Sequence, residues 1–203
     1  DSGDNWYLGQ SGDNSNYYKG KIDEVRVYNR SLTPSEVQSL YSTSQHGSIT
    51  TEWNAGGPVK PQLTETDWSR TDAPGSSDLV GAWRLNEDYG SSSSGDKVKD
   101  WSVNGNSGTT NGGINTDVES AFEGSYAFEF DGSDDNILIP HDSSLNVPYL
   151  TLSAWIETDV KSDGVVRRAV RKQDAYVIEK DGSGDINFYI RSGQDNNWNS
   201  VQI

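Results

Sequence analysis

The chain has 203 residues and a formal net charge of −15, and 32% of its residues are hydrophobic. An acidic surface of this kind disfavours nucleic acid and anionic membranes as partners and favours bound cations. No apolar run is long enough to cross a bilayer, so membrane insertion is not expected. Cysteine is absent, which excludes disulfides and thiol chemistry. The seven Trp, ten Tyr and four Phe recur within alternating segments, which indicates a folded β protein rather than a disordered chain.

The segment from residue 20 to residue 41 holds the strongest local signals. Val25 and Val27 alternate with Arg26 and Tyr28, as in a half-buried strand, and strict alternation places Asp23 on the valine face. The sequence therefore predicts a strand that carries an acidic side chain among apolar ones.

A short helix is predicted at about 34–41. Thr33 supplies an N-cap hydroxyl, Pro34 fits the first helical position, and Glu36 stands three residues after the cap. One face of this helix would carry its apolar residues, which are Val37, Leu40 and Tyr41.

The rest of the chain divides into two parts. Residues 44–78 are rich in Pro, Gly, Ser and Thr without sustained periodicity, which predicts a linker. From Leu79 onward, apolar residues alternate again in short segments, interrupted by a turn-rich run over 86–113. The Asp181-Gly182 turn between two of the last segments predicts a hairpin.

Residues 20–29 (GKIDEVRVYN), with Tyr7-Leu8-Gly9 before them and 32–37 after them, resemble the closing strands of LamG-like jellyroll domains of the concanavalin A-like superfamily. The part from residue 79 onward resembles the opening portion of the same family. The motifs that carry this second resemblance are WRLNE at 83–87, the run at 100–109, FEFDG at 128–132 and LSAWI at 152–156. Val103 replaces a glycine that is usual in the second motif, and the family's middle strands are found nowhere in the chain.

The resemblance implies an all-β fold: a two-sheet antiparallel jellyroll sandwich of concanavalin A-like type, incomplete, with one short helix near 34–41. Residues 1–43 would be a C-terminal piece, 44–78 a linker and 79–203 an N-terminal piece. The chain is then either a fragment cut from a tandem array or a circular permutation in which 1–43 pack on 79–203. Packing of the two pieces predicts that strand 21–28 pairs with strand 79–85.

Asp23 is the first candidate metal ligand, because a carboxylate on an apolar face is costly unless it is paired, hydrogen-bonded or metal-bound. In the packed arrangement it is expected near Glu87 and Asp100. The resemblance implies one structural calcium ion, which prefers clustered oxygen ligands. The alternative is that Asp23 caps a turn and that Asp100 organises its loop through backbone hydrogen bonds.

Sugar recognition uses aromatic faces flanked by polar groups. Trp155 and Tyr189 each lie opposite the apolar face of their own segment, so both are expected to line the outer face of one sheet. Asn187, Arg191 and Trp198 would lie beside them as further ligand-binding residues. The alternative is that a second sheet or a loop covers these rings as ordinary core.

Two other charged clusters are better explained as solvated loops. One is the oxygen-rich connection at residues 134–136. The other is the basic cluster of Arg167, Arg168, Arg171 and Lys172, whose functional alternative is binding of sulfated or uronic polysaccharides.

No catalytic constellation is found, and Glu65-Thr66-Asp67 is the nearest approach to the paired carboxylates of glycosidases in the superfamily. We therefore expect a module that is not an enzyme. The resemblance implies that it belongs to a larger extracellular or surface protein and binds a polysaccharide or glycoprotein, or serves adhesion. The competing classes are a structural spacer in a tandem array and an accessory domain of a glycoside hydrolase.

Overall fold

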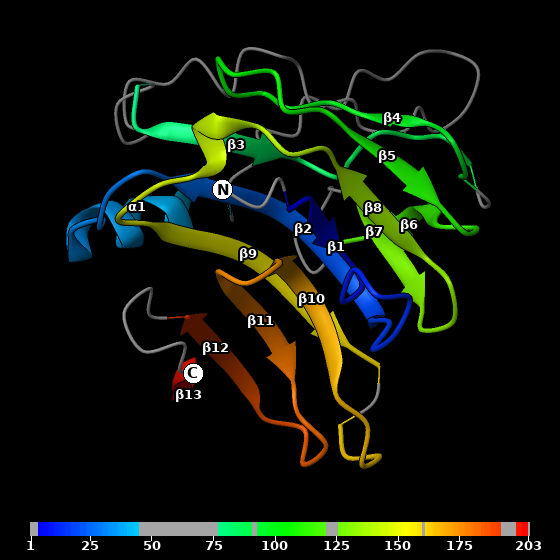
Figure 1. Ribbon diagram of the computed structural model, residues 1–203. Helices are drawn as coiled ribbons and strands as arrows, with labels where there is room; N and C mark the ends of the chain where they lie inside the picture. The colour runs from blue at the N-terminus through cyan, green and yellow to red at the C-terminus, as the bar shows by residue number, and fades with distance from the viewer. Residues whose placement is uncertain are drawn as a thin grey trace.

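The computed structural model describes residues 4–44, 77–90, 93–120, 126–159, 161–191 and 198–202. Most of the predicted linker lies outside these residues, and the predicted domain boundaries remain a prediction. Within the described residues the strands form two antiparallel sheets (Figure 1). The fold is therefore an all-β, two-sheet antiparallel sandwich, as the sequence predicts.

The larger sheet has eight strands in the order β13-β12-β11-β10-β1-β8-β5-β4. Their bounds are β1 (Trp6–Leu8), β4 (Lys97–Val98), β5 (Gly108–Asn111), β8 (Asn136–Ile139), β10 (Arg167–Lys172), β11 (Tyr176–Lys180), β12 (Ile186–Arg191) and β13 (Trp198–Gln202). The predicted hairpin is present as the β11–β12 pair. Strands β4 and β5 lie within the run expected to consist of turns, because short strands rich in polar residues carry little apolar periodicity.

Strand β2 (Lys19–Tyr28) holds the five-stranded sheet together. One edge of β2 pairs with β9 (Thr151–Thr158), and the other edge pairs first with β7 (Tyr126–Asp131) and then with β3 (Leu79–Trp83). The fifth strand, β6 (Asn115–Glu119), pairs with β7. The predicted pairing of strand 21–28 with strand 79–85 is therefore confirmed.

A β-bulge at Glu24 corrects the predicted orientation of Asp23. The β2–β9 register shifts between Asp23 and Arg26, and Glu24 has a left-handed φ of 52°. Because the extra residue resets the alternation of side chains, Ile22 and the two valines face the core while Asp23 faces the other side of the sheet. The prediction that Asp23 shares the valine face is wrong.

The core between the sheets consists of large apolar side chains with little or no exposure, among them Trp6, Leu8, Ile22, Val25, Trp83, Phe128, Phe130, Ile137 and Ile139. Trp6 of the larger sheet and Trp83 of the smaller one lie with ring centroids 5.8 Å apart. Inner-face residues of β9 and β12, such as Leu152 and Phe188, are only partly buried. Burial is therefore deepest around β2 and β8.

Helix α1 (Pro34–Ser44) follows β2 and begins where predicted. The Thr33 amide donates to Glu36 Oε2 (2.8 Å) and the Glu36 amide donates to Thr33 Oγ1 (3.3 Å), which is a capping box. The helix ends three residues later than expected. Its apolar face is not fully packed, because Val37 and Tyr41 are each 51% exposed.

Candidate functional site

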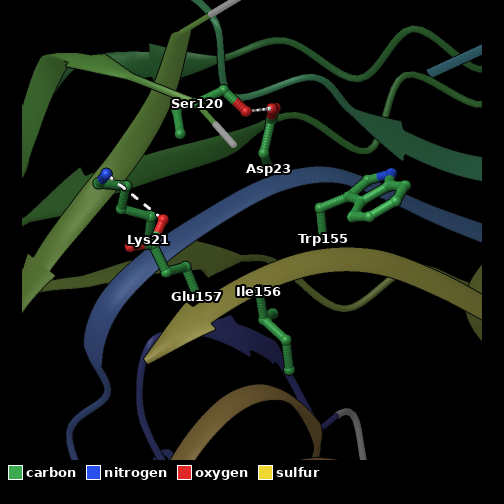
Figure 2. A pocket seen from close by; sticks show the side chains of 7 residues that line it. Lys21, Asp23, Ser120, Trp155, Ile156 and Glu157 are labelled. Carbon is green, nitrogen blue, oxygen red and sulfur yellow. Dashed lines mark hydrogen bonds and ion pairs between the residues drawn. The ribbon is translucent and has the colours of Figure 1, made fainter. Parts of the chain in front are cut away.

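A pocket lies on the outer face of the five-stranded sheet, where β2 and β9 run side by side (Figure 2). Asp23 and Trp155 are direct partners in the β2–β9 register. The other lining residues are Lys21, Ser120, Ala127, Ile156 and Glu157. The pocket therefore brings together Asp23, which the sequence suggested as a metal ligand, and Trp155, which it suggested as a sugar-binding residue.

Asp23 is 2% exposed and makes one side-chain hydrogen bond. Its Oδ2 accepts from the Ser120 hydroxyl at 2.5 Å, whereas its Oδ1 is buried without a hydrogen-bond partner. Burial raises the pKa of the Asp23 carboxyl well above its ordinary value, and the adjacent charge of Glu24 raises it further. A buried oxygen without a partner costs free energy, so this carboxyl is poised to accept a hydrogen bond from a ligand.

The rim of the pocket is charged on one side and aromatic on the other. Lys21 Nζ lies 3.4 Å from Glu157 Oε2, an ion pair that is partly open to solvent. On the aromatic side, the Tyr41 ring of α1 lies over the Trp155 ring, with centroids 5.5 Å apart and planes tilted by 31°. Because Tyr41 is half exposed, the two rings present apolar surface at the edge of the pocket.

The predicted metal ligands are not brought together. Among the described residues, the group of three carboxylates with ligand atoms within 4.8 Å of one another does not include Asp23, Glu87 or Asp100. Asp100 instead accepts four hydrogen bonds, from Ala82 N, Ser102 N, Ser102 Oγ and Asn106 N. Glu87 Oε1 accepts from Lys99 N at 3.4 Å, and burial raises the pKa of Glu87. A calcium ion at these residues stays a prediction.

The carboxylates that do cluster are those of the loop between β7 and β8: Asp131, Asp134 and Asp135. Asp135 is 3% exposed and accepts from Gly113 N (2.7 Å) and Asp131 N (2.9 Å). The other two carboxylates are exposed. Asp135 therefore orders a loop that the sequence suggested to be merely solvated.

The expected grouping of Trp155 with Tyr189 is wrong, because the two residues lie in different sheets. Trp155 is in β9 of the five-stranded sheet, whereas Asn187, Tyr189 and Arg191 are in β12 of the eight-stranded sheet. Trp198 of β13 is the register partner of Arg191, so four of the five expected residues do lie together. Alternation predicts the face of a strand but not the sheet to which it belongs.

The basic cluster is divided by the alternation of β10. Lys172 is 6% exposed and donates to Leu145 O at 3.1 Å, so the prediction that the whole cluster is solvated is wrong. Arg167 pairs with Asp163 (2.8 Å) and Arg168 with Glu179 (3.0 Å).

Arg171 has no hydrogen bond or ion pair within the part of the chain that the structure describes. Burial lowers the pKa of its guanidinium, and so does the nearby charge of Arg168. It lies in a cross-strand row whose other members are Tyr7, Val177 and Tyr189.

Sequence reasoning missed four polar or aromatic residues of the pocket and its rim: Lys21, Tyr41, Ser120 and Glu157. Lys21 and Glu157 stand two positions from Asp23 and Trp155, so they share the same face of their strands. The two-residue spacing can be read from the sequence, but it places Lys21 beside Glu157 only once β2 is known to pair with β9. Nothing in the sequence places Ser120 beside Asp23.

The fold defines the class of the protein as a two-sheet antiparallel β-sandwich. Residues 1–38 match the family model described as the Concanavalin A-like lectin/glucanases superfamily, a stretch that includes β1, β2 and the start of α1. No curated protein and no solved structure matches the chain. In the described residues no helix has the length and apolar character needed to cross a membrane.

Proposed function

We propose that the chain is a non-catalytic carbohydrate-binding module of a larger extracellular or surface protein, and that glycans bind at the pocket between Asp23 and Trp155. The observation that carries this proposal is that the buried Asp23 Oδ1 has no hydrogen-bond partner and lies beside the aromatic pair of Tyr41 and Trp155. Sugar rings present C–H faces that stack on aromatic rings, while their hydroxyls need fixed polar partners. The pocket supplies both kinds of group within one small area.

The proposal is tested by titrating the purified protein with neutral oligosaccharides. Tryptophan fluorescence and calorimetry measure the binding. We expect saturable binding that falls at least about tenfold in Trp155→Ala, which corresponds to about 1.4 kcal/mol. The matched control is Tyr149→Ala, which removes an exposed aromatic ring that does not line the pocket and should leave this binding intact. Unchanged binding in Trp155→Ala would contradict the proposed site.

A structural spacer is the competing class, and it predicts a different outcome. A spacer shows no saturable binding of any glycan, and Trp155→Ala then changes only stability. An accessory domain of a glycoside hydrolase would bind glycans as proposed here, and the sequence that flanks the module would reveal the enzyme.

A second glycan-binding face is favoured by Arg171, a guanidinium without an ion pair among the described residues of an acidic protein. Neighbouring Arg168 and the row that contains Tyr7 and Tyr189 would make this face suitable for uronic or sulfated glycans. Binding of heparin and polygalacturonate to the protein and to Arg171→Ala tests it. Equal binding by both proteins would dismiss this face.

A further inference from the structure

The polar atoms around the pocket are an unusual set, because acceptors outnumber available donors. Asp23 Oδ1 accepts from no group among the described residues, and the Ser120 hydroxyl already donates to Asp23 Oδ2. The other side-chain donors among the lining residues are Lys21, which is engaged by Glu157, and the single indole N–H of Trp155. A ligand that fits this set brings donors rather than acceptors. A primary ammonium group has three donors and no acceptor.

Charge favours the same kind of ligand. Of the two adjacent carboxyls of β2, Glu24 has a partner, because Arg26 Nη2 lies 2.6 Å from its Oε2. The more deeply buried Asp23 lacks a cationic partner at hydrogen-bonding distance among the described residues. A buried carboxylate without a countercharge is costly, and a cation placed against it removes much of that cost. The indole of Trp155 lines the same pocket, and aromatic faces attract cations. The net charge of −15 adds a long-range attraction of the same sign.

Exposure separates the two halves of the site. Tyr41 is 51% exposed and offers area on which a sugar ring can stack, whereas Asp23 is 2% exposed. Only a small group that projects from the ring can therefore reach the free Asp23 oxygen. An amine substituent on a sugar ring is such a group.

We propose that the glycan bound at this pocket is an amino sugar with a free amine, held with its ring against Tyr41 and Trp155 and its ammonium group on Asp23. This inference rests on the proposed carbohydrate-binding function and adds the chemical class of the ligand. Polysaccharides that contain 2-amino-2-deoxy sugars without N-acetyl groups are the expected ligands. Acetylation removes both the charge and two of the three donors, so it should weaken binding.

Protonation of Asp23 supplies an independent readout. Among the described residues, the charged groups that line the pocket or act on this carboxyl are Lys21, Glu24 and Arg26 of β2 and Glu157 of β9. Burial raises the pKa of Asp23, and an ammonium group placed against the carboxylate lowers it again, so binding releases a proton at pH values where the free protein still holds it. Calorimetry in buffers of different ionisation enthalpy should detect the released proton.

The experiment compares a β-linked glucosamine oligomer with its fully N-acetylated counterpart, each titrated into the whole chain. We expect the free amine form to bind at least about tenfold more tightly, the ratio that corresponds to about 1.4 kcal/mol. Asp23→Asn should abolish this preference while binding of the acetylated form persists. The matched control is Asp185→Asn, which removes an exposed carboxylate on the other sheet and should keep the preference.

The outcomes separate the two proposals. Equal affinity for both oligomers, or a preference that survives Asp23→Asn, would overturn the amino-sugar inference and leave carbohydrate binding standing. If Asp185→Asn loses the preference to the same extent, the preference is only the attraction between a polycation and an acidic protein. That outcome would also overturn the amino-sugar inference. Absence of binding to either oligomer and to neutral glycans would overturn both proposals.

Discussion

Val25 of β2 lies directly opposite Trp83 of β3, so a strand from the start of the chain is paired with a strand that follows the predicted linker. Both side chains are fully buried in one core. The two segments that resemble the end and the beginning of one family of domains are therefore parts of a single sandwich. The pocket depends on this arrangement, because Asp23 is held on β2 beside β9.

The pairing predicts that Trp83→Ala lowers the stability of the whole sandwich. Trp83 is completely buried, its ring lies near that of Trp6, and its Nε1 donates to Asn106 O at 2.9 Å. Removal of a buried Trp costs about 3–5 kcal/mol of unfolding free energy. Urea denaturation measures this loss, with Val103→Ala, a site that is 77% exposed, as the control expected to change little. A loss no larger than that of Val103→Ala would argue against a shared core.

Much of this fold follows from local signals in the sequence. The capping box fixes the start of α1 at Pro34, and the β-branched alternation of residues 25–28 fixes β2. The pairing of β2 with β3 was predicted from the resemblance of these segments to motifs of a known family. Local patterns could not supply β5 or β6, whose polar residues carry no clear period.

Gly20 is required where β2 passes β9. Its φ is +135°, and a Cβ at this position would lie 2.1 Å from the Glu157 carbonyl oxygen, which is a backbone atom and cannot move aside easily. Gly105 also has a positive φ, +72°, but a Cβ added there would meet nothing within 4 Å. We therefore expect Gly20→Ala to lose at least about 2 kcal/mol more unfolding free energy than Gly105→Ala. Equal losses in thermal or urea unfolding would contradict this close approach.

The site was less predictable than the fold, and the reason is the bulge at Glu24. One inserted residue reverses the face of everything before it, so strict alternation placed Asp23 in the core. Trp155 and Tyr189 show the second limit, because each has the expected orientation in its strand while sheet membership depends on long-range pairing. Arg171 and Lys172 are adjacent in sequence, yet only Lys172 turns toward the core.

Asp23 predicts a pH dependence of stability. Burial raises the pKa of its carboxyl in the folded chain, so at pH values between the unfolded and folded pKa the folded state holds the additional proton. The stability contributed by this group is therefore fully present below the unfolded pKa and is lost as the pH rises through the folded pKa. Asn is neutral at every pH, so Asp23→Asn should gain stability over the parent protein as the pH rises from acid to neutral. Because the charge of Glu24 contributes to the raised pKa of Asp23, the difference between the two proteins includes the loss of this repulsion, which acts in the same direction.

Urea unfolding of both proteins over this pH range measures the effect. Asp185→Asn, which changes an exposed carboxylate by the same substitution, is the control. A constant difference between Asp23→Asn and the parent protein at all pH values would show that the pKa of Asp23 is the same in the folded and unfolded chains, which would contradict this prediction. If Asp23→Asn is stabilised at neutral pH and has also lost amino-sugar preference, the buried carboxyl is retained for binding at a cost in stability.

Asp100 distinguishes a hydrogen-bonded loop from a calcium site. Its carboxylate is 5% exposed and accepts four hydrogen bonds, two of them from Ala82 N and Asn106 N. Asp100→Ala leaves these buried donors without a partner, so we expect a loss of about 3 kcal/mol or more of unfolding free energy. If hydrogen bonding is the role of Asp100, the loss is the same with calcium and with EDTA. Melting of Asp100→Ala and the parent protein under both conditions measures it, and a loss that disappears in EDTA would instead support the predicted structural calcium ion.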